Sequence, residues 1–287
     1  MNHDVVLSKL LARGTPAALV DLLDNWIRKA TSKVKWRTSI SDSFGMRIGL
    51  NQGSVLAPAL FAIVIDDILT RANRRCIGLI IAYADDIIIV SRSVFNLQVL
   101  FCHLEHDLNL INLYLNVDKC ACIRIGPRHS KLCAPICSLV GSSVPSVSEL
   151  RYLGVYLLSG DVFRTSVQYQ KKKFCRAVNA IFSKTLGLAN EDVVVYLLKV
   201  KCLPILLYAS EVCSLRKSIV SSLDFLVIRF GMKLFKSNNR DLVVTSFSFM
   251  GLELPSLLVL KRWRTFQSRS ISVSNLIFRR ICSSSLT

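Results

Sequence analysis

Two adjacent carboxylates, Asp85 and Asp86, stand between two apolar runs and are the side chains best placed to do chemistry. The runs, residues 79–82 and 87–90, have the composition of buried strands, and the polar break between them predicts a tight hairpin. An ionised aspartate resists burial unless it is paired or bound to metal. Since Mg²⁺ prefers oxygen ligands, a divalent metal would explain a carboxylate pair at this position.

A solvated turn is the competing interpretation, because Asp-Asp is also a common turn dipeptide. The full tetrapeptide Tyr83, Ala84, Asp85 and Asp86, with apolar strands on both sides, is far more specific than the dipeptide. In two-metal phosphoryl transfer, carboxylate-bound ions stabilise both the attacking and the leaving oxygen. The tetrapeptide therefore favours metal-assisted chemistry over a plain turn.

Helices and a hairpin precede these aspartates. Residues 4–30 predict two helices separated by Gly14, Thr15 and Pro16, with Thr15 as a cap candidate and Pro16 in the first turn of the second helix. The residues Leu19, Leu22, Leu23 and Trp26 recur at helical spacing and predict its apolar face. The ranges that follow are a hairpin over residues 33–48, a loop from Gly49 entering a helix that contains Pro58 and runs to Leu69, and an amphipathic helix over residues 97–115.

The second half changes in character. Residues 120–125 and 152–156 predict short strands, with a loop or edge region between them. From about residue 161 the pattern becomes helical and basic. The predicted helices include residues 174–182, 193–207 with an interruption at Pro204, and 223–235, and a frayed tail is expected from Ser283.

Charge is distributed unevenly along the 287 residues, which suffice for one large domain or two small ones. The net charge is +18, and residues 161–287 contain 20 Lys and Arg against 7 Asp and Glu. A basic half predicts a partner with a phosphate backbone. An anionic membrane surface and a merely solvated basic face are the alternatives.

Several classes of protein are disfavoured. Mean hydropathy is high at +0.44, yet no uncharged apolar run reaches the roughly 18 residues of a membrane span. The first residues do not resemble a signal peptide, and ten scattered cysteines predict free thiols. We therefore expect an intracellular protein, nuclear or cytoplasmic, that is neither secreted nor bound to a membrane. Cys102, His103 and His106 lack a fourth zinc ligand at standard spacing, which favours a helix-surface role.

Four segments in order resemble the reverse transcriptases of non-LTR (LINE-type) retrotransposons. They are residues 49–61 (G-L-N-Q-G-S-V-L-A-P-A-L-F), 83–86 (Y-A-D-D), 115–120 (L-N-V-D-K-C) and 150–155 (L-R-Y-L-G-V). The resemblance covers most of residues 1–235. It implies an α+β fold, in which a polymerase palm, an antiparallel sheet with packed helices, is followed by an all-helical thumb. The implied boundaries are 1–160 for the palm, 161–236 for the thumb and 237–287 for a basic C-terminal extension.

The same resemblance implies an RNA-directed DNA polymerase that uses Mg²⁺, an RNA template, a DNA primer and dNTPs, with no stable protein partner indicated. Asp85 and Asp86 would be catalytic metal ligands, and Lys119 would face the leaving pyrophosphate unless it is a plain surface lysine. The implied substrate contacts are Tyr83, Ala84, Gln52, Gly53 and Ser54. The implied phosphate contacts of the thumb are Lys171, Lys172, Lys173 and Arg176. The alternative interpretation of these four cations is a solvated helix face.

The chain also departs from the family pattern. Asn51 stands where a basic residue is usual and Ala57 where serine is usual, which would weaken nucleotide or template contacts. Asn2 and His3 resemble the trailing end of the first catalytic motif, so its aspartate is expected upstream of this chain. We therefore expect an N-terminally truncated polymerase that is inactive, or nearly so, by itself. The alternatives are a non-catalytic nucleic-acid-binding remnant and a membrane-associated helical protein.

Asp66 and Asp67 form a second acidic pair, ahead of the aspartate hairpin. Because they stand close to the predicted end of a helix, we expect them to lie on the solvated surface and to take no part in the chemistry.

Overall fold

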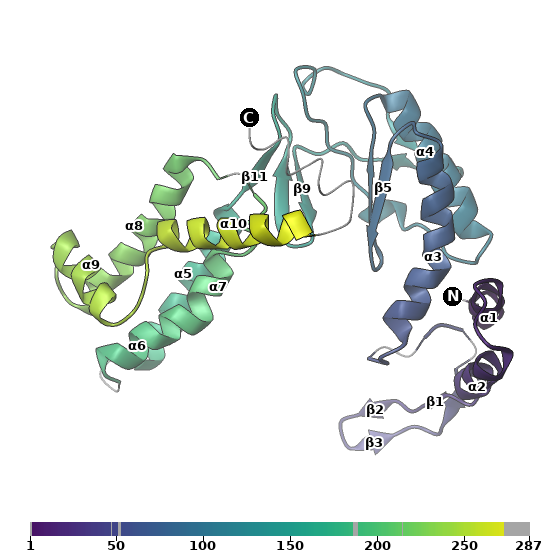
Figure 1. Cartoon of the computed structure of the whole chain (residues 1–287), viewed down its shortest axis with the longest axis horizontal. Helices are drawn as coiled ribbons and strands as arrows, with labels where there is room; N and C mark the ends of the chain where they lie inside the picture. The colour runs from purple at the N-terminus through teal and green to yellow at the C-terminus, as the bar shows by residue number, and fades with distance from the viewer. Residues whose placement is uncertain (1, 47, 51–52, 186–188, 214, 273–287) are drawn as a thin grey trace. The chain divides into compact units, whose positions relative to one another are not determined.

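A computed structural model describes residues 2–46, 48–50, 53–185, 189–213 and 215–272 (Figure 1). The chain divides into two compact units, Met1–Leu153 and Gly154–Thr287. Both contain helices and small antiparallel sheets, which confirms the predicted α+β class. Within the described ranges no helix is long and apolar enough to cross a membrane.

Two helices open the first unit, as predicted: α1 (His3–Ala12) and α2 (Ala17–Arg28). Asn2 caps α1 by accepting a hydrogen bond from the Asp4 amide at 3.0 Å. The predicted Thr15 cap is wrong, because Pro16 occupies the capping position of α2 and supplies no side-chain hydrogen bond.

The apolar face predicted for α2 is wrong at three of its four positions. Val20 and Ile27 are its buried residues, and Leu23 packs against the cluster that contains Val20, as predicted, whereas Leu19, Leu22 and Trp26 are exposed. Helical periodicity shows that a helix has an apolar side, but the packing partner decides which side is covered.

Four short strands follow and confirm the hairpin predicted over residues 33–48. The outer strands β1 (Thr31–Ser32) and β4 (Phe44–Gly45) pair antiparallel. The inner strands β2 (Lys35–Trp36) and β3 (Ser39–Ile40) also pair antiparallel.

Two long helices build the core of the first unit. The first, α3 (Ala57–Arg74), carries Pro58 in its first turn as predicted. The second, α4 (Val94–Asn109), starts at Ser93, whose hydroxyl accepts from the Asn96 amide. Its predicted extension to residue 115 is wrong. The chain leaves the helix after Asn109 and turns at Asn112, where φ is +56°.

The strands β5 (Leu79–Tyr83) and β6 (Asp86–Val90) form the predicted hairpin and contact α3 and α4 (Figure 1). One face of the ribbon, including Ile80, Ile87 and Ile89, packs against those helices. The other face, including Ile81 and Val90, is exposed. The expectation that both runs are buried is therefore half wrong, because alternate side chains of a strand point to opposite faces and the helices cover only one.

The rest of the first unit is irregular. It contains a 3₁₀ turn (Val117–Lys119) and the strands β7 (Ile136–Cys137), β8 (Ser143–Val144) and β9 (Glu149–Tyr152). The strand predicted over residues 120–125 is wrong, since only an isolated bridge links Cys122 to Ser146. The side chain of Gln98, on α4, hydrogen-bonds the backbone of β7 as a neighbouring strand would. Its amide donates to the Cys137 carbonyl at 2.6 Å, and its oxygen accepts from the Cys137 N–H at 2.8 Å.

The second unit begins with the antiparallel strands β10 (Val155–Leu158) and β11 (Arg164–Ser166). The strand predicted over residues 152–156 is wrong, because Leu153 and Gly154 form a turn with φ of +45° and +81°. A strand at residues 164–166 also means that the helical region starts later than residue 161.

Helices form the remainder of the second unit. They are α5 (Gln168–Thr185), α6 (Glu191–Leu197), a π-helical turn (Leu198–Cys202), α7 (Leu203–Leu206), α8 (Lys217–Leu234), α9 (Arg240–Phe249) and α10 (Pro255–Ser272). The π turn lies just before Pro204, whose missing N–H breaks the regular ladder at the predicted interruption. The predicted frayed tail from Ser283 lies outside the described residues.

A close approach of two helices marks the core of this unit. Gly231 of α8 faces Phe247 and Val243 of α9, and a Cβ atom at Gly231 would overlap both side chains. Phe174, Leu198 and Val227 lie in the same buried cluster. The absence of a side chain at Gly231 therefore permits the packing of α8 against α9.

Candidate active site and nucleic-acid interface

The aspartate pair lies at the exposed tip of the β5–β6 hairpin. Tyr83 pairs with Asp86, so Ala84 and Asp85 form a two-residue turn. Ala84 has a φ of +52°, a left-handed conformation that is uncommon for a residue with a side chain. Asp85, Asp86 and Tyr83 are exposed. The tip therefore presents two carboxylates and an aromatic ring to any molecule that approaches it.

A side chain of α3 braces this hairpin. The Asn73 amide donates to the Ile80 carbonyl at 2.9 Å, and the Ile80 N–H donates to the Asn73 side-chain oxygen at 2.7 Å. Ile80 is only 2% exposed, so these backbone groups have no ready access to water. The Asn73 side chain therefore supplies hydrogen-bond partners for backbone groups of β5 on the edge that does not pair with β6. Sequence reasoning missed it, although asparagine near the end of an apolar helix is a weak signal for such a bond.

A second residue that sequence reasoning missed, Tyr152 on β9, feels the charge of one of the aspartates. Burial raises the pKa of the Tyr152 phenol, and the negative charge of Asp86 raises that pKa further. A long-range electrostatic interaction thus links the two segments recognised in the sequence, around residues 83–86 and 150–155.

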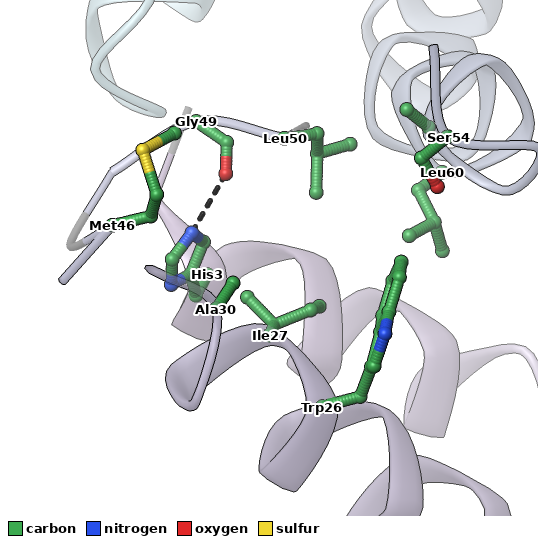
Figure 2. Close-up of a pocket in the computed structure, with 10 residues that line it drawn as sticks. His3, Trp26, Ile27, Ala30, Met46, Gly49, Leu50, Ser54 and Leu60 are labelled. Atoms are coloured by element: carbon green, nitrogen blue, oxygen red, sulfur yellow. Dashed lines mark hydrogen bonds between the residues drawn. The ribbon is translucent and has the colours of Figure 1, made fainter. Parts of the chain in front are cut away.

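The glycine-containing loop before α3 is anchored from α1 (Figure 2). The Nε2 atom of His3 lies 2.7 Å from the carbonyl oxygen of Gly49, and His3 is 5% exposed. Gly49 and Gly53 have φ of +96° and +86°, which favour glycine over residues with a Cβ. Ser54 is half-buried and lines a pocket that His3 also lines. The histidine therefore fixes the start of the loop.

The other predicted substrate residues are less constrained. Asn51 and Gln52 lie outside the described residues. Lys119 is exposed at the end of the 3₁₀ turn and has no ion-pair partner in the described part of the chain. Across that same part, no hydrogen bond or ion pair links Gly53, Ser54 or Lys119 to the aspartates.

The donor set at the tip suits part of a magnesium site. Mg²⁺ takes oxygen ligands, commonly one or two carboxylates completed by water and substrate phosphates. Asp85 and Asp86 offer such oxygens at an exposed position. In the described ranges, no three His, Cys, Asp or Glu side chains gather into a group able to hold a metal. A two-metal site needs bridging carboxylates beyond this pair.

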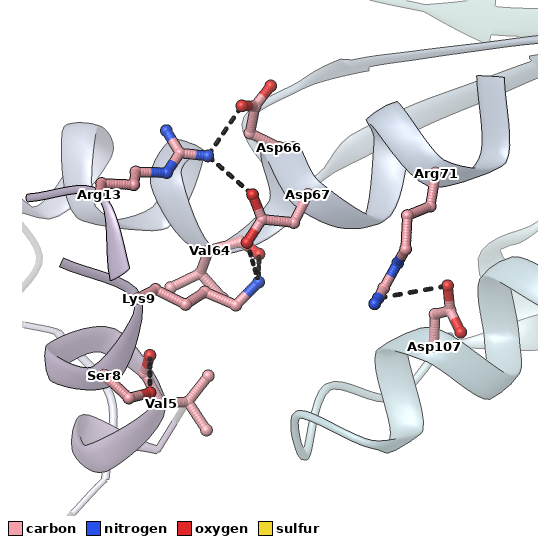
Figure 3. A network of polar contacts seen from close by, with 9 residues as sticks. All are labelled: Val5, Ser8, Lys9, Arg13, Val64, Asp66, Asp67, Arg71 and Asp107. Carbon is pink, nitrogen blue, oxygen red and sulfur yellow. Dashed lines mark hydrogen bonds and ion pairs between the residues drawn. The ribbon is translucent and has the colours of Figure 1, made fainter. Parts of the chain in front are cut away.

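The second acidic pair, Asp66 and Asp67, lies on the solvent-accessible surface as predicted, with side chains 61% and 46% exposed, but it is not at a helix end (Figure 3). Both residues lie in the middle of α3 and face α1. Lys9 contacts Asp67 at 2.9 Å, and Arg13 contacts Asp66 and Asp67 at 2.8 and 3.0 Å. Lys9, and then Arg13, lowers the pKa of the Asp67 carboxyl. The pair therefore joins two helices and is electrostatically satisfied.

The four predicted phosphate-binding cations of α5 divide into two groups. Lys172 and Arg176 are exposed and line a groove. Lys171 is half-buried and donates to the Ser222 hydroxyl of α8 at 2.7 Å. Lys173 lies over the ring of Tyr169, 4.7 Å from its centre. Two of the four cations are thus directed at protein groups.

Two residues of the opposite wall of this groove were missed by sequence reasoning. Ser222 and Phe225 belong to α8, and Phe225 is exposed. They lie more than 45 residues along the chain from the α5 cations, so no local spacing links the two sets. An aromatic ring beside Lys172 and Arg176 is a combination that proteins use to bind nucleic acid.

Comparison with known proteins identifies the class to which this chain belongs. Residues 1–157 match the family described as reverse transcriptase (RNA-dependent DNA polymerase). The match covers more than half of the chain, which therefore belongs to this family.

Two curated relatives indicate which kind of reverse transcriptase this chain resembles. The chain is 29% identical, over 169 residues, to the retrovirus-related Pol polyprotein from type-2 retrotransposable element R2DM of Drosophila melanogaster, which covers 54% of the chain. It is 23% identical, over 253 residues, to the Pol polyprotein from type-1 retrotransposable element R2 of Popillia japonica, which covers 83% of the chain. The chain spans 16% and 41% of these relatives. The predicted resemblance to a non-LTR reverse transcriptase is confirmed.

Proposed function

We propose that this chain supplies the aspartate hairpin and the nucleic-acid-binding helices of an RNA-directed DNA polymerase. The substrates would be an RNA template, a DNA primer and dNTPs. The observation that carries the proposal is the exposed Asp85–Asp86 pair at the tip of a hairpin fixed by Asn73. Residues 1–160 would form the palm, 161–236 the thumb and 237–287 a basic extension.

Each residue at the tip has a role that its exposure permits. Asp85 and Asp86 would hold magnesium, which when bound supplies positive charge to the phosphate oxygens during nucleotidyl transfer. The exposed ring of Tyr83 would support the primer end. Ala84 has a small side chain and would leave room for the incoming nucleotide.

The loop before α3 would contact the nucleotide and the template through Gln52, Gly53 and Ser54. Since Gly53 has no side chain and a positive φ, its backbone can approach a ligand closely. His3 would keep the loop in place through Gly49. Lys119 would place a positive charge near the leaving pyrophosphate, and its exposure leaves it free to do so.

The α5 groove would bind the phosphate backbone of the template–primer duplex. Lys172 and Arg176 are open to solvent there, while Lys171 and Lys173 would contribute after small side-chain movements. Such contacts are independent of base sequence and weaken steeply as salt rises.

A metal-binding measurement tests the proposal on the whole chain. Mn²⁺, a spectroscopic substitute for Mg²⁺, should bind weakly, and Asp85→Asn or Asp86→Asn should remove that binding. Asp42→Asn is a matched control, because Asp42 is an exposed aspartate of the same unit. Mn²⁺ binding that is unaffected by either hairpin substitution, as followed by electron paramagnetic resonance, would exclude the pair as metal ligands.

Primer extension gives the second test. With template, primer, dNTPs and Mg²⁺, the chain alone should extend the primer no more than background, since no third carboxylate joins Asp85 and Asp86 among the described residues. Extension that disappears in Asp85→Ala would show that a further carboxylate completes the site, and would refute the expected inactivity. Duplex binding without metal binding would instead identify a non-catalytic nucleic-acid-binding remnant.

A further inference from the structure

The β2–β3 ribbon of the first unit is a basic and aromatic surface that the proposed active site does not use. Trp36 is 74% exposed, and Val34 and Ile40 of the same ribbon are also exposed. None of the three belongs to a buried hydrophobic cluster of the described residues. Scattered apolar side chains on a surface need no explanation, but an exposed tryptophan on a ribbon of two short strands with other exposed apolar residues does.

The cations of this ribbon are not neutralised. Lys33, Lys35 and Arg37 are exposed, and in the described part of the chain they have no carboxylate within ion-pair distance. The cations of α1 differ, because Lys9 and Arg13 are both paired with aspartates of α3. The ribbon therefore keeps its full positive charge available for a partner.

The strand register distributes these groups around the ribbon. Trp36 lies opposite Ser39, and Lys35 lies opposite Ile40. Since facing residues share one side of a sheet and neighbours alternate, Trp36 and Lys35 occupy opposite faces. Arg37 stands in the turn, where its φ is +54°. An aromatic plane, a flexible cation behind it and a cation at the tip thus lie within three consecutive residues.

We propose that this ribbon binds single-stranded nucleic acid, with a base stacked on Trp36 and backbone phosphates contacted by Lys35 and Arg37. Stacking on an aromatic ring with cations along the backbone is the combination that binds single strands without sequence preference, because every base has a π-face. The positive charge favours a polyanion over a neutral partner. A stable protein interface involves about 20–30 residues on each partner, whereas this ribbon consists of two strands of two residues each. The inference needs no catalysis and does not depend on the aspartate hairpin.

A fluorescence titration of the full chain tests the site directly. In a Trp26→Phe, Trp263→Phe background, Trp36 is the remaining tryptophan. A single-stranded oligouridine should quench its emission, and the affinity from quenching should equal that from anisotropy of the labelled oligonucleotide. Absence of quenching at saturating oligonucleotide would overturn the proposal.

Substitutions in the wild-type background separate the contributions. Trp36→Ala should weaken binding about 5- to 150-fold, the range converted from the usual stacking contribution, and Trp36→Phe should retain most of the affinity. Arg37→Asn, chosen because asparagine tolerates a positive φ, should reduce the slope of log K against log salt by about 0.7. Tyr114→Ala is the matched control, since Tyr114 is an aromatic residue of the same unit at 75% exposure.

The competing outcomes are distinct. Equal losses for Trp36→Ala and Tyr114→Ala would mean that Trp36 has no special role and would refute the site. Unchanged oligonucleotide affinity in Trp36→Ala, together with loss of self-association in sedimentation, would assign the ribbon to contact with a second copy of the chain. Far-ultraviolet circular dichroism of each variant verifies that the fold is retained.

Discussion

The hydrogen bonds from Asn73 to Ile80 provide the sharpest test of how the aspartate hairpin is held. Asn73→Ala removes the partner of both backbone groups of Ile80, whose donor–acceptor distances are 2.7 and 2.9 Å. Because Ile80 is 2% exposed, water cannot readily replace the lost partner without opening the packing between β5 and α3. The hairpin that carries Asp85 should then separate from the helix more easily.

The size of the effect follows from these contacts. A buried backbone group without a partner costs about 1–3 kcal/mol, so two such groups cost about 2–6 kcal/mol. Alanine favours the helix over asparagine by about 0.5 kcal/mol, which offsets a small part of that cost. The net loss should be about 2–5 kcal/mol, a large fraction of the roughly 5–15 kcal/mol that stabilises a typical domain.

Urea unfolding and amide hydrogen exchange measure this loss. With an m-value of about 2 kcal/mol per molar urea, the unfolding midpoint of the first unit should fall by about 1–2.5 M. The Ile80 amide should exchange faster by a factor that reflects the same free energy. Asn25→Ala is the matched control, because Asn25 is an exposed asparagine in the last turn of α2. Equal effects of the two substitutions would refute the bracing role of Asn73.

Three further predictions test other parts of the structure. Lys9 and Arg13 lower the pKa of Asp67, so the stability that this carboxylate contributes is present above its unfolded pKa and is lost as pH falls through its folded pKa. At pH values below about 4 the melting temperature should therefore decrease, and the decrease should be smaller in Asp67→Asn. In thermal unfolding, Gly231→Ala should destabilise the second unit by about 1–3 kcal/mol, because the added Cβ overpacks the core. Gly160→Ala is the control and should be nearly neutral, because an added Cβ there makes only an ordinary contact. Burial raises the pKa of the Cys202 thiol to about 11, so at pH 8 iodoacetamide should alkylate exposed thiols well before Cys202. Peptide mass spectrometry would measure this order, and early alkylation of Cys202 would contradict its burial.

Local sequence patterns determined the elements around the candidate site. Continuous apolar runs on both sides of Asp85 and Asp86 predicted the hairpin, and Gly14 with Pro16 predicted the break between the first two helices. These features depend on backbone conformations and short-range periodicity, which neighbouring residues largely fix. The four ordered segments likewise sufficed to recognise the reverse transcriptase family, because the match depends on residue identity and order rather than on packing.

Tertiary structure alone decided which groups meet. The buried side of α2, the pairing of Asp67 with Lys9, the bond of Lys171 to Ser222 and the bracing of Ile80 by Asn73 all join elements that are separate in the sequence. Burial and electrostatic satisfaction depend on the partner that packs against an element, and a local pattern contains no record of that partner. The sequence by itself therefore determined the family and the residues capable of chemistry, whereas the packing of helices on strands decided which of those residues are held, neutralised or left open to a ligand.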